Sequence, residues 1–432
     1  MKKHIKLLIV LGIILVGGFS FYLFKGYKKD AFVYENNKIK PSSSGIAMML
    51  ETSAGSGNYE MTTRSEWSTE GYVFNANLSK CENGSELSWD NENKKVLMSG
   101  NKSDKCYVYF DVYVPPTIAD FCNSGDTLTT CAKNFGNQGT DMSNIYIHNS
   151  GLTNGAGDNS YRYAGASDQV NNYVCFGSNV TPCPADNLYR IIGVFGDKVK
   201  LIKADYATST LLGTDGDYKQ AYTATGNDSS NYKGNNLANI AAYNWNKNGE
   251  NTWSTSLLNK TNLNKNFTIN IGDEWANKIA MTTWKVGGNR DANIAKQPAQ
   301  TAYQNEVVNP VPWEYSSTGE TEYSAKIGLM YVSDYMYAAP QDKWTLVGWN
   351  DDASKDYRAA RSVNWMYMGL NEWTISRCAD ISNIAFSVNY AGCVEEPFVG
   401  DDAFGVRPVF YLSSSVNYVS GSGTAADPIV IN

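Results

Sequence analysis

The segment Leu188-Tyr-Arg-Ile-Ile-Gly-Val-Phe195 is followed by Gly196-Asp197 and then by Lys198-Val-Lys-Leu-Ile-Lys203. Both runs are rich in β-branched and other apolar residues, and a two-residue turn of the Gly-Asp type separates them. The sequence therefore predicts a β-hairpin over residues 188–203. A hairpin alone is marginally stable, so the chain around it must supply the rest of a core.

The residues that follow the hairpin alternate between short apolar segments and turns. Apolar residues at helical spacing predict helices over residues 252–259 and 272–280. Ser333-Asp334 is a plausible N-cap for a further short helix. Runs of β-branched and aromatic residues predict strands over residues 327–332, 372–376, 385–390 and 405–412. This pattern predicts an α+β, β-rich domain over residues 156–432.

The chain before this domain divides into segments of different composition. Residues 31–44 are polar, with Pro41 and three serines, and are predicted to be a linker. Residues 45–116 are predicted to be a small β module, which ends in an aromatic, β-branched strand over residues 106–114 and in Pro115-Pro116. Residues 117–155 are rich in Gly, Asn, Ser and Thr, and we expect a connector there.

The N-terminus carries lysines on both sides of an apolar run from Leu7 to Phe24. Eighteen apolar residues are just enough to cross a bilayer core. No small-x-small cleavage site follows the run, which favours an uncleaved signal anchor over residues 1–30. A cleaved signal peptide stays open as the alternative.

Eight cysteines follow the anchor as four close pairs, namely Cys81 and Cys106, Cys122 and Cys131, Cys175 and Cys183, and Cys378 and Cys393. An even number of cysteines behind an export signal is typical of disulfides, and we expect sequential pairing. A zinc site is disfavoured because there is no C-x-x-C motif and there are two histidines. The chain is thus expected to be a single-pass protein of the cell membrane, with its domains outside the cell.

Several classes of function are disfavoured by composition and motifs. A net charge of -7 argues against nucleic acid as a partner. The sequence lacks a phosphate-binding Gly-rich loop and a dinucleotide fingerprint, and apart from His4 it offers only His148 as a base for nucleophilic catalysis. We therefore expect a binding protein rather than an enzyme.

Five motifs carry a resemblance to a known family, and they lie within residues 156–432. They are Leu188-Tyr-Arg-Ile-Ile-Gly-Val, Trp253-Ser-Thr-Ser-Leu-Leu-Asn, Ala325-Lys-Ile-Gly-Leu-Met-Tyr-Val-Ser-Asp-Tyr, Glu372-Trp-Thr-Ile-Ser-Arg377 and Gly405-Val-Arg-Pro-Val-Phe-Tyr-Leu412. In their order they resemble a family of bacterial extracytoplasmic domains of unknown function, the DUF6273-like domains. The resemblance implies a C-type-lectin-like fold. The N-terminal module is similar to small cysteine-containing modules that precede such domains, which implies an Ig-like β-sandwich.

The leading hypothesis is a membrane-anchored surface protein or adhesin that recognises a glycan or a protein through its C-terminal domain. A structural envelope protein without a small ligand is one alternative. An extracytoplasmic hydrolase is another, because acidic residues are plentiful and a pair of them could serve glycoside hydrolysis.

The predicted ligand surface lies between residues 349 and 402, where aromatic and small polar side chains are concentrated. Such residues suit recognition surfaces, although part of them could belong to the core. The candidates are Trp349, Asn350, Asp351, Trp365, Tyr367, Asn383, Asn389 and Tyr390.

Calcium is a weaker candidate at the same surface. Trp349-Asn350-Asp351 resembles the Trp-Asn-Asp segment of calcium-dependent lectins, whose oxygen ligands suit a hard cation. The Glu-Pro-Asn or Gln-Pro-Asp motif of those lectins is absent from the sequence. The calcium candidates are Asp351, Asp352, Asp401 and Asp402, and a solvated acidic loop is the alternative for each pair.

Trp373, Arg377 and Arg407 lie within the motifs and invite two interpretations. They could form a site, or they could be structural. An arginine between Val406 and Pro408 in an apolar strand needs a buried partner. We therefore expect Arg407 to be paired inside the domain.

Overall fold

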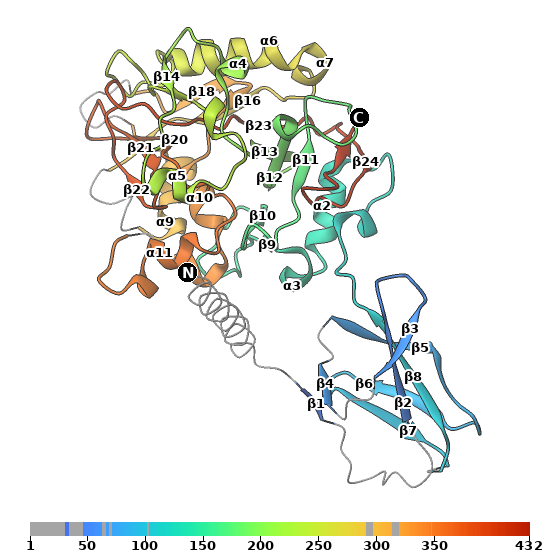
Figure 1. Cartoon of the computed structure of the whole chain (residues 1–432). Helices are drawn as coiled ribbons and strands as arrows, with labels where there is room; N and C mark the ends of the chain where they lie inside the picture. The colour runs from blue at the N-terminus through green and yellow to red at the C-terminus, as the bar shows by residue number, and fades with distance from the viewer. Residues whose placement is uncertain are drawn as a thin grey trace, which may run out of the picture. The chain divides into compact units, whose positions relative to one another are not determined.

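The computed structural model describes residues 31–33, 46–62, 66–68, 71–101, 103–290, 297–312, 319–346 and 348–432 (Figure 1). The chain divides into two compact units, Met1–Pro115 and Pro116–Asn432. The expected signal anchor over residues 1–30 lies outside the described residues. Within the described ranges, no helix is both long and apolar enough to cross a membrane.

The N-terminal unit is built from strands. They are β1 (Ala31–Val33), β2 (Ile46–Glu51), β3 (Tyr59–Thr62), β4 (Glu66–Ser68), β5 (Tyr72–Cys81), β6 (Glu86–Asp90), β7 (Lys95–Ser99) and β8 (Cys106–Val112). Strands β3, β2, β8 and β5 form a sheet in that order, with β2 and β8 parallel. The hairpin β6–β7 supplies Trp89, whose ring contacts Phe74 and Phe110 of the sheet. Aromatic packing of this kind forms the small core of the unit.

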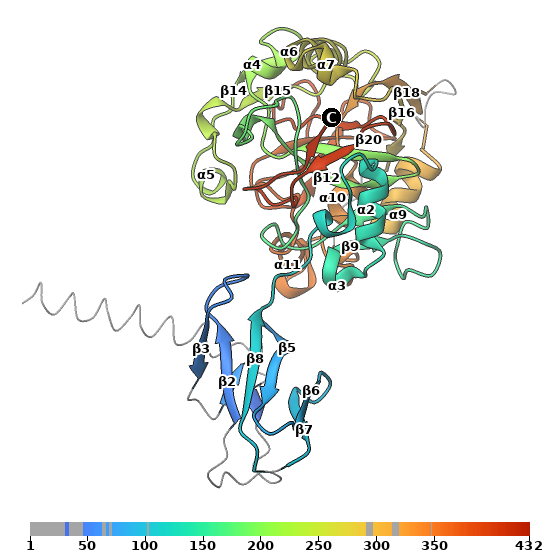
Figure 2. The same cartoon turned by 90° about the vertical axis from the view of Figure 1, so that its right-hand side faces the viewer.

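The C-terminal unit mixes helices and strands, as the sequence predicts for a β-rich α+β domain (Figure 2). Its helices are η1 (Ile118–Phe121), α2 (Leu128–Gly136), α3 (Thr140–Ser143), η2 (Ala185–Asn187), α4 (Ser209–Leu212), α5 (Asn227–Asn231), η3 (Leu237–Asn239), η4 (Leu258–Phe267), α6 (Thr268–Ile271), α7 (Asp273–Ala276), α9 (Ala299–Tyr303), η5 (Gln304–Val308), α10 (Val332–Tyr337), η6 (Gln341–Lys343), η7 (Ala353–Lys355) and α11 (Tyr357–Arg361). Its strands are β9 (Ile145–Ile147), β10 (Tyr161–Tyr163), β11 (Tyr173–Cys175), β12 (Leu188–Phe195), β13 (Lys198–Lys203), β14 (Tyr218–Ala221), β15 (Ala241–Tyr243), β16 (Thr282–Lys285), β17 (Gly288–Asn289), β18 (Glu322–Ala325), β19 (Ile327–Gly328), β20 (Glu372–Cys378), β21 (Ala385–Val388), β22 (Val394–Glu395), β23 (Val409–Tyr411), β24 (Tyr418–Ser420) and β25 (Val430–Ile431).

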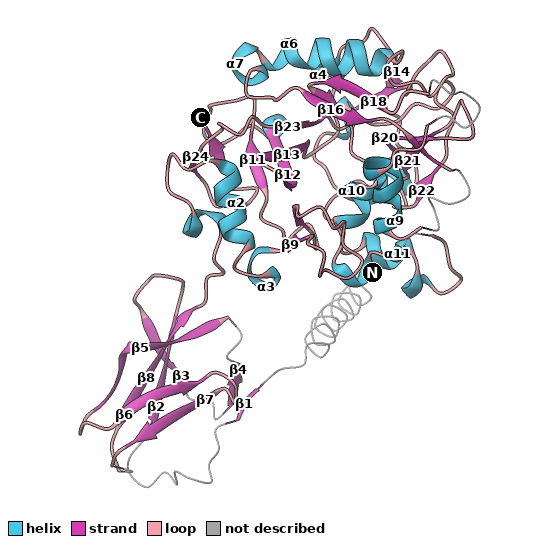
Figure 3. Cartoon of the chain, turned by 180° about the vertical axis from the view of Figure 1, so that it is seen from behind, coloured by secondary structure: helices cyan, strands magenta, loops and turns pink. Residues whose placement is uncertain are grey.

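A seven-stranded sheet organises this unit. Its main path runs β19-β23-β13-β12-β10-β9, and β11 pairs with β12. A second sheet has the order β17-β20-β21-β22. In Figure 3 the strands β11, β12, β13 and β23 lie at the centre of the unit, with helices around them. Both faces of the main sheet are therefore covered, and β12 and β13 are almost completely buried.

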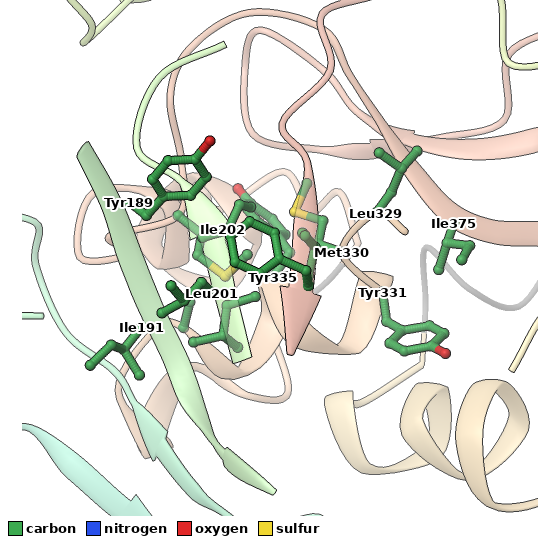
Figure 4. Close-up of a cluster of buried hydrophobic side chains, with 14 of the residues drawn as sticks. Tyr189, Ile191, Leu201, Ile202, Leu329, Met330, Tyr331, Tyr335 and Ile375 are labelled. Carbon is green, nitrogen blue, oxygen red and sulfur yellow. The ribbon is translucent and has the colours of Figure 1, made fainter. Parts of the chain in front are cut away.

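The predicted hairpin is confirmed as β12 and β13, which pair antiparallel around the turn at Gly196-Asp197. Gly196 has a φ of 64°, a conformation that glycine adopts without steric cost. Gly193 lies at a bulge in β12, and a Cβ there would be 2.3 Å from the Tyr161 carbonyl oxygen. Leu201 and Ile202 join the core, part of which is shown in Figure 4.

Residues 117–155 do not form the expected connector but belong to the C-terminal unit. Helix α2 places Leu128, Cys131 and Phe135 on one buried face at helical spacing. Strand β9 pairs with β10 and so extends the main sheet. The apolar segments of these elements are short and are surrounded by polar loops, so the sequence pattern did not predict them.

Three other elements differ from their predicted bounds. The helix expected over residues 252–259 begins only at Leu258, and that expected over residues 272–280 ends at Ala276. The strand expected over residues 327–332 ends at Gly328, because Asp334 accepts a hydrogen bond from the Tyr331 amide and starts α10 there. The short helix is thus confirmed, but its predicted N-cap is wrong, because Tyr331 is the N-cap and Ser333 and Asp334 lie in the first turn of α10.

Three of the four predicted disulfides are confirmed, namely Cys81–Cys106, Cys122–Cys131 and Cys175–Cys183. The fourth prediction is wrong, because Cys378 and Cys393 are free thiols. Strand β21 lies between their strands, and they flank its opposite ends, near Ala385 and Val388. Two strand spacings alone amount to about 10 Å, more than the ~7 Å between Cα atoms that a disulfide tolerates.

Candidate ligand-binding site

The residues of the predicted ligand surface do not share one exposed face. Trp349 is 67% exposed, whereas Trp365 is 1% exposed. The Trp365 indole donates to the Tyr163 carbonyl oxygen at 2.8 Å and stacks beneath the Arg190 guanidinium. Trp365 therefore belongs to the core and offers no ring face to a ligand.

Tyr367, Asn389 and Tyr390 support a turn rather than a site. The Tyr367 hydroxyl donates to the Tyr390 carbonyl oxygen at 2.6 Å. The Asn389 side-chain oxygen accepts from the backbone amides of Ala391 and Cys393. These bonds fix the turn between β21 and β22. Asn383 lies half-buried before β21, where its carbonyl oxygen accepts from the Val399 amide.

The loop that carries Asn350, Asp351 and Asp352 is held by bonds of its own. The Asn350 side-chain oxygen accepts from the Asp352 amide, and the Asp352 carboxylate accepts from Ser354 and pairs with Lys355. These hydrogen bonds lower the pKa of Asp352. Two of the three polar side chains therefore already have partners within the loop.

The four calcium candidates do not gather into one cluster. Asp402 accepts from the Phe398 amide at 2.8 Å, while Asp351 and Asp401 are exposed. Throughout the described part of the chain, the one group of three or more close potential metal ligands is Cys122, Asp126 and Cys131. Two members of that group form a disulfide and offer no thiolate.

Arg407 has the buried partner that the sequence predicts. It forms an ion pair with Glu372 at 2.7 Å, and both side chains are buried. Arg377 donates to the Val286 carbonyl oxygen, and the Trp373 indole donates to the Tyr243 carbonyl oxygen. The structural interpretation therefore holds for all three motif residues.

A cavity of about 480 Å³ opens elsewhere, over the end of the central hairpin. Helix α4 and residues of α6 form one wall, and β14, η3 and β15 form another. Tyr189 of β12 and Lys203 of β13 form its base. These two residues are directly opposite each other in the hairpin, so their side chains share a face of the sheet.

Lys203 is the distinctive group of this cavity. Its side chain is 1% exposed, and its ammonium has no hydrogen-bond partner among the described residues. Burial lowers the pKa of the ammonium, and the nearby Arg407 lowers it further, while the carboxylates of Asp186 and Asp205 act in the opposite direction. A buried ammonium without a hydrogen-bond partner is costly because it loses hydration, and the two carboxylates offset only part of that loss, since the pKa of Lys203 is lowered overall.

The two carboxylates near Lys203 differ in what they contact. Asp205 accepts from the Tyr232 hydroxyl at 2.6 Å and from the Asn235 amide, so its oxygens have partners. Asp186 is exposed on the rim of the cavity. Of the cavity-lining residues in the described chain, Asp186 is the one carboxylate.

The walls of the cavity are polar and stiff. The Asn270 amide donates to the carbonyl oxygens of Thr210 and Leu211, which ties α6 to α4. Asn239 donates to the side-chain oxygen of Asn236 at 2.5 Å. Hydroxyl, amide and tyrosine side chains thus surround a single cation. This arrangement suits a small polar ligand that carries one anionic group.

None of the cavity residues is among the candidates that sequence reasoning singled out. Lys203 ends an alternating strand, where a lysine normally indicates a solvated face. The available signal was the pairing within the hairpin, which puts Lys203 opposite an aromatic residue. Comparisons with protein-family models, curated proteins and solved structures found no match for this chain.

Proposed function

We propose that this chain is a surface-displayed binding protein whose C-terminal unit holds an acidic glycan residue in the Lys203 cavity. The observation that carries the proposal is the buried Lys203 ammonium, for which the described chain supplies no hydrogen-bond partner. A ligand carboxylate would provide the missing acceptor. Ligand hydroxyls would meet the Asp186 carboxylate and the amide side chains of the walls, and the half-buried Tyr218 would add a ring surface.

The proposed setting is the outer face of a bacterial membrane. Residues 1–30 would anchor the chain, and the N-terminal unit would be an Ig-like β-sandwich that spaces a C-type-lectin-like domain from the bilayer. Three disulfides support this setting, because such bonds persist in oxidising compartments.

The cavity favours binding over the two alternative functions. A hydrolase of the paired-carboxylate type needs two acidic groups that face each other across the scissile bond. Asp186 has no second carboxylate beside it among the described lining residues. A purely structural envelope protein would give no reason for a polar cavity above a buried lysine.

The test is binding of the purified full-length chain, in detergent, to an array of acidic and neutral glycans. We expect binding to glycans that end in a carboxylate-bearing sugar and none to the matched neutral sugars. Lys203→Met keeps the apolar stem and should weaken binding about ten- to a hundredfold, since a hydrogen bond to a charged group contributes about 1.5–3 kcal/mol. Lys198→Met on the same strand is the control, because Lys198 does not line the cavity.

Two outcomes would contradict the proposal. One is the absence of acidic-glycan binding by the unmodified chain. The other is equal binding by the Lys203→Met and Lys198→Met variants. A parallel array with a chelator tests the calcium hypothesis, because binding that requires calcium would move the site toward Asp351 and Asp352.

A further inference from the structure

The opposite face of the main sheet holds a second cluster of buried charges. Arg162, Gly193, Lys200 and Tyr411 lie opposite one another across strands β10, β12, β13 and β23. Residues opposite one another in antiparallel strands point to the same face. Because Gly193 has no side chain, Arg162 and Lys200 can approach each other above it, and the Phe195 ring contacts both cations.

Asp334 of α10 reaches this row and contacts both cations. Its Oδ2 lies 2.5 Å from Lys200 Nζ, and its Oδ1 lies 3.7 Å from Arg162 Nη1. The side chains of Lys200 and Asp334 are 1% and 2% exposed. Arg162 Nη1 has no hydrogen-bond partner in the described part of the protein. Arg162 Nη1 is therefore a hydrogen-bond donor near Asp334 Oδ1, whereas Lys200 contacts Asp334 Oδ2.

The surroundings of this pair are aromatic. The Lys200 ammonium also lies near the rings of Trp284, Tyr331 and Tyr411. Burial lowers the pKa of Lys200, an effect that Asp334 opposes. In such surroundings the ionised pair is less favoured relative to neutral amine and carboxylic acid than it is in water.

A third carboxyl group, Glu306, lies next to the pair. It accepts a hydrogen bond from the amide of Ser333, the residue before Asp334, and another from the Ser376 hydroxyl. Burial raises the pKa of Glu306 to about 7, and the nearby Asp334 raises it as well. Glu306 is thus able to take up and release a proton near neutral pH.

We propose that Lys200 and Asp334 condense into an intramolecular isopeptide bond, so that the mature protein carries a covalent cross-link between β13 and α10. The residues are 134 positions apart in the chain. The bond would join the central hairpin to α10.

The reaction is balanced without any outside reagent. A proton passes from the Lys200 ammonium to the Asp334 carboxylate, which leaves an amine and a carboxylic acid in contact. The nitrogen lone pair attacks Cγ, the new N–C bond forms, and Arg162 stabilises the negative charge on the carbonyl oxygen. Glu306 moves a proton from the nitrogen to the departing hydroxyl, the C–OH bond breaks, and one water molecule leaves.

The other ion pairs between described residues lack one of these elements. Arg407 and Glu372 are equally buried, but a guanidinium keeps its proton and is a poor nucleophile. Lys285 and Glu322 form a close pair, yet both side chains are partly exposed and hydrated. Among the described pairs, only Lys200 and Asp334 join a buried lysine to a buried carboxylate.

The experiment is mass spectrometry of the reduced, denatured full-length chain, followed by peptide mapping. We expect the unmodified protein to be lighter than its sequence by one water molecule. Its tryptic digest should contain a branched peptide that holds both Lys200 and Asp334. Lys200→Met should show its full sequence mass, and Glu306→Gln should contain a mixture of linked and unlinked chains.

The unmodified protein alone decides the question, so a variant that fails to fold does not obscure it. Recovery of Asp334 in an unbranched peptide, together with cleavage after Lys200, would overturn the proposal. So would the loss of one water molecule that persists in Lys200→Met. Glycan binding enters neither measurement, so this inference stands apart from the proposed function.

Discussion

Replacement of Glu306 by glutamine should remove a loss of stability that the C-terminal unit undergoes as the pH rises. The Glu306 carboxyl is buried, and its pKa rises from 4.5 to about 7 on folding. Its two hydrogen bonds, from the Ser333 amide and the Ser376 hydroxyl, resist this rise but do not offset the loss of water. Glutamine has the same shape and can bond to the same two partners.

The sign and the size of the effect follow from linkage. Because the folded pKa of Glu306 is raised, its contribution to stability is fully present below about pH 4.5 and is lost as the pH rises toward 7. The gap between 4.5 and about 7 corresponds to about 3 kcal/mol, at 1.36 kcal/mol per unit of pKa. Most of this loss should fall between pH 5 and pH 8.

The assay is urea unfolding of the wild type and Glu306→Gln at pH 5 and pH 8, followed by tryptophan fluorescence. The free energy of unfolding of the variant, relative to the wild type, should rise by about 2–3 kcal/mol between the two pH values. Both proteins also carry Lys200→Met, so neither can form the cross-link and the comparison depends on the residue at position 306 alone. Glu322→Gln is the control, because Glu322 is 52% exposed and its replacement makes the same change in net charge. Equal pH dependence in the wild type and Glu306→Gln would refute the reasoning.

Two further predictions concern side chains for which the structure differs from the prediction made from the sequence. Trp365→Ala should destabilise the C-terminal unit by about 3–5 kcal/mol, whereas Trp349→Ala should stay within about 0.5 kcal/mol, and similar values in urea unfolding would contradict the burial of Trp365. The denatured, unreduced chain should react with two equivalents of a thiol reagent, at Cys378 and Cys393. The folded chain should react slowly, because burial raises the pKa of both thiols to about 12, and a count of zero in denaturant would restore the fourth disulfide.

Local patterns in the sequence were enough to predict the features that depend on neighbours in the chain. The hairpin over residues 188–203 follows from two apolar runs and one turn, and three disulfides join cysteines that are close in sequence. Arg407 could be predicted to have a buried partner because an arginine in an apolar strand requires one. These inferences need only strand geometry and the cost of burying charge.

Local sequence patterns could not show which residues of the predicted ligand surface are exposed and which are buried. A recognition surface and a protein core can contain the same aromatic and amide side chains, so composition does not distinguish the two. Trp365 and Asn389 form hydrogen bonds with backbone atoms, and the sequence contains no pattern that predicts either bond. The Cys378 and Cys393 pair fails for a related reason, because β21 passes between their strands.

The two buried lysines of β13 show how a ligand-binding residue can be distinguished from a structural residue once the fold is known. Lys200 and Lys203 are three residues apart, so they point to opposite faces of a sheet that is covered on both sides. Lys200 has Asp334 at 2.5 Å, so the protein itself supplies the partner of this side chain. Lys203 has no hydrogen-bond partner within the described residues, although its burial costs as much. A stable fold gains nothing from that cost, since an apolar residue would serve better at the base of the cavity. Lys203→Met should therefore stabilise the chain while it weakens ligand binding, and a destabilised variant would mean that Lys203 serves the fold instead.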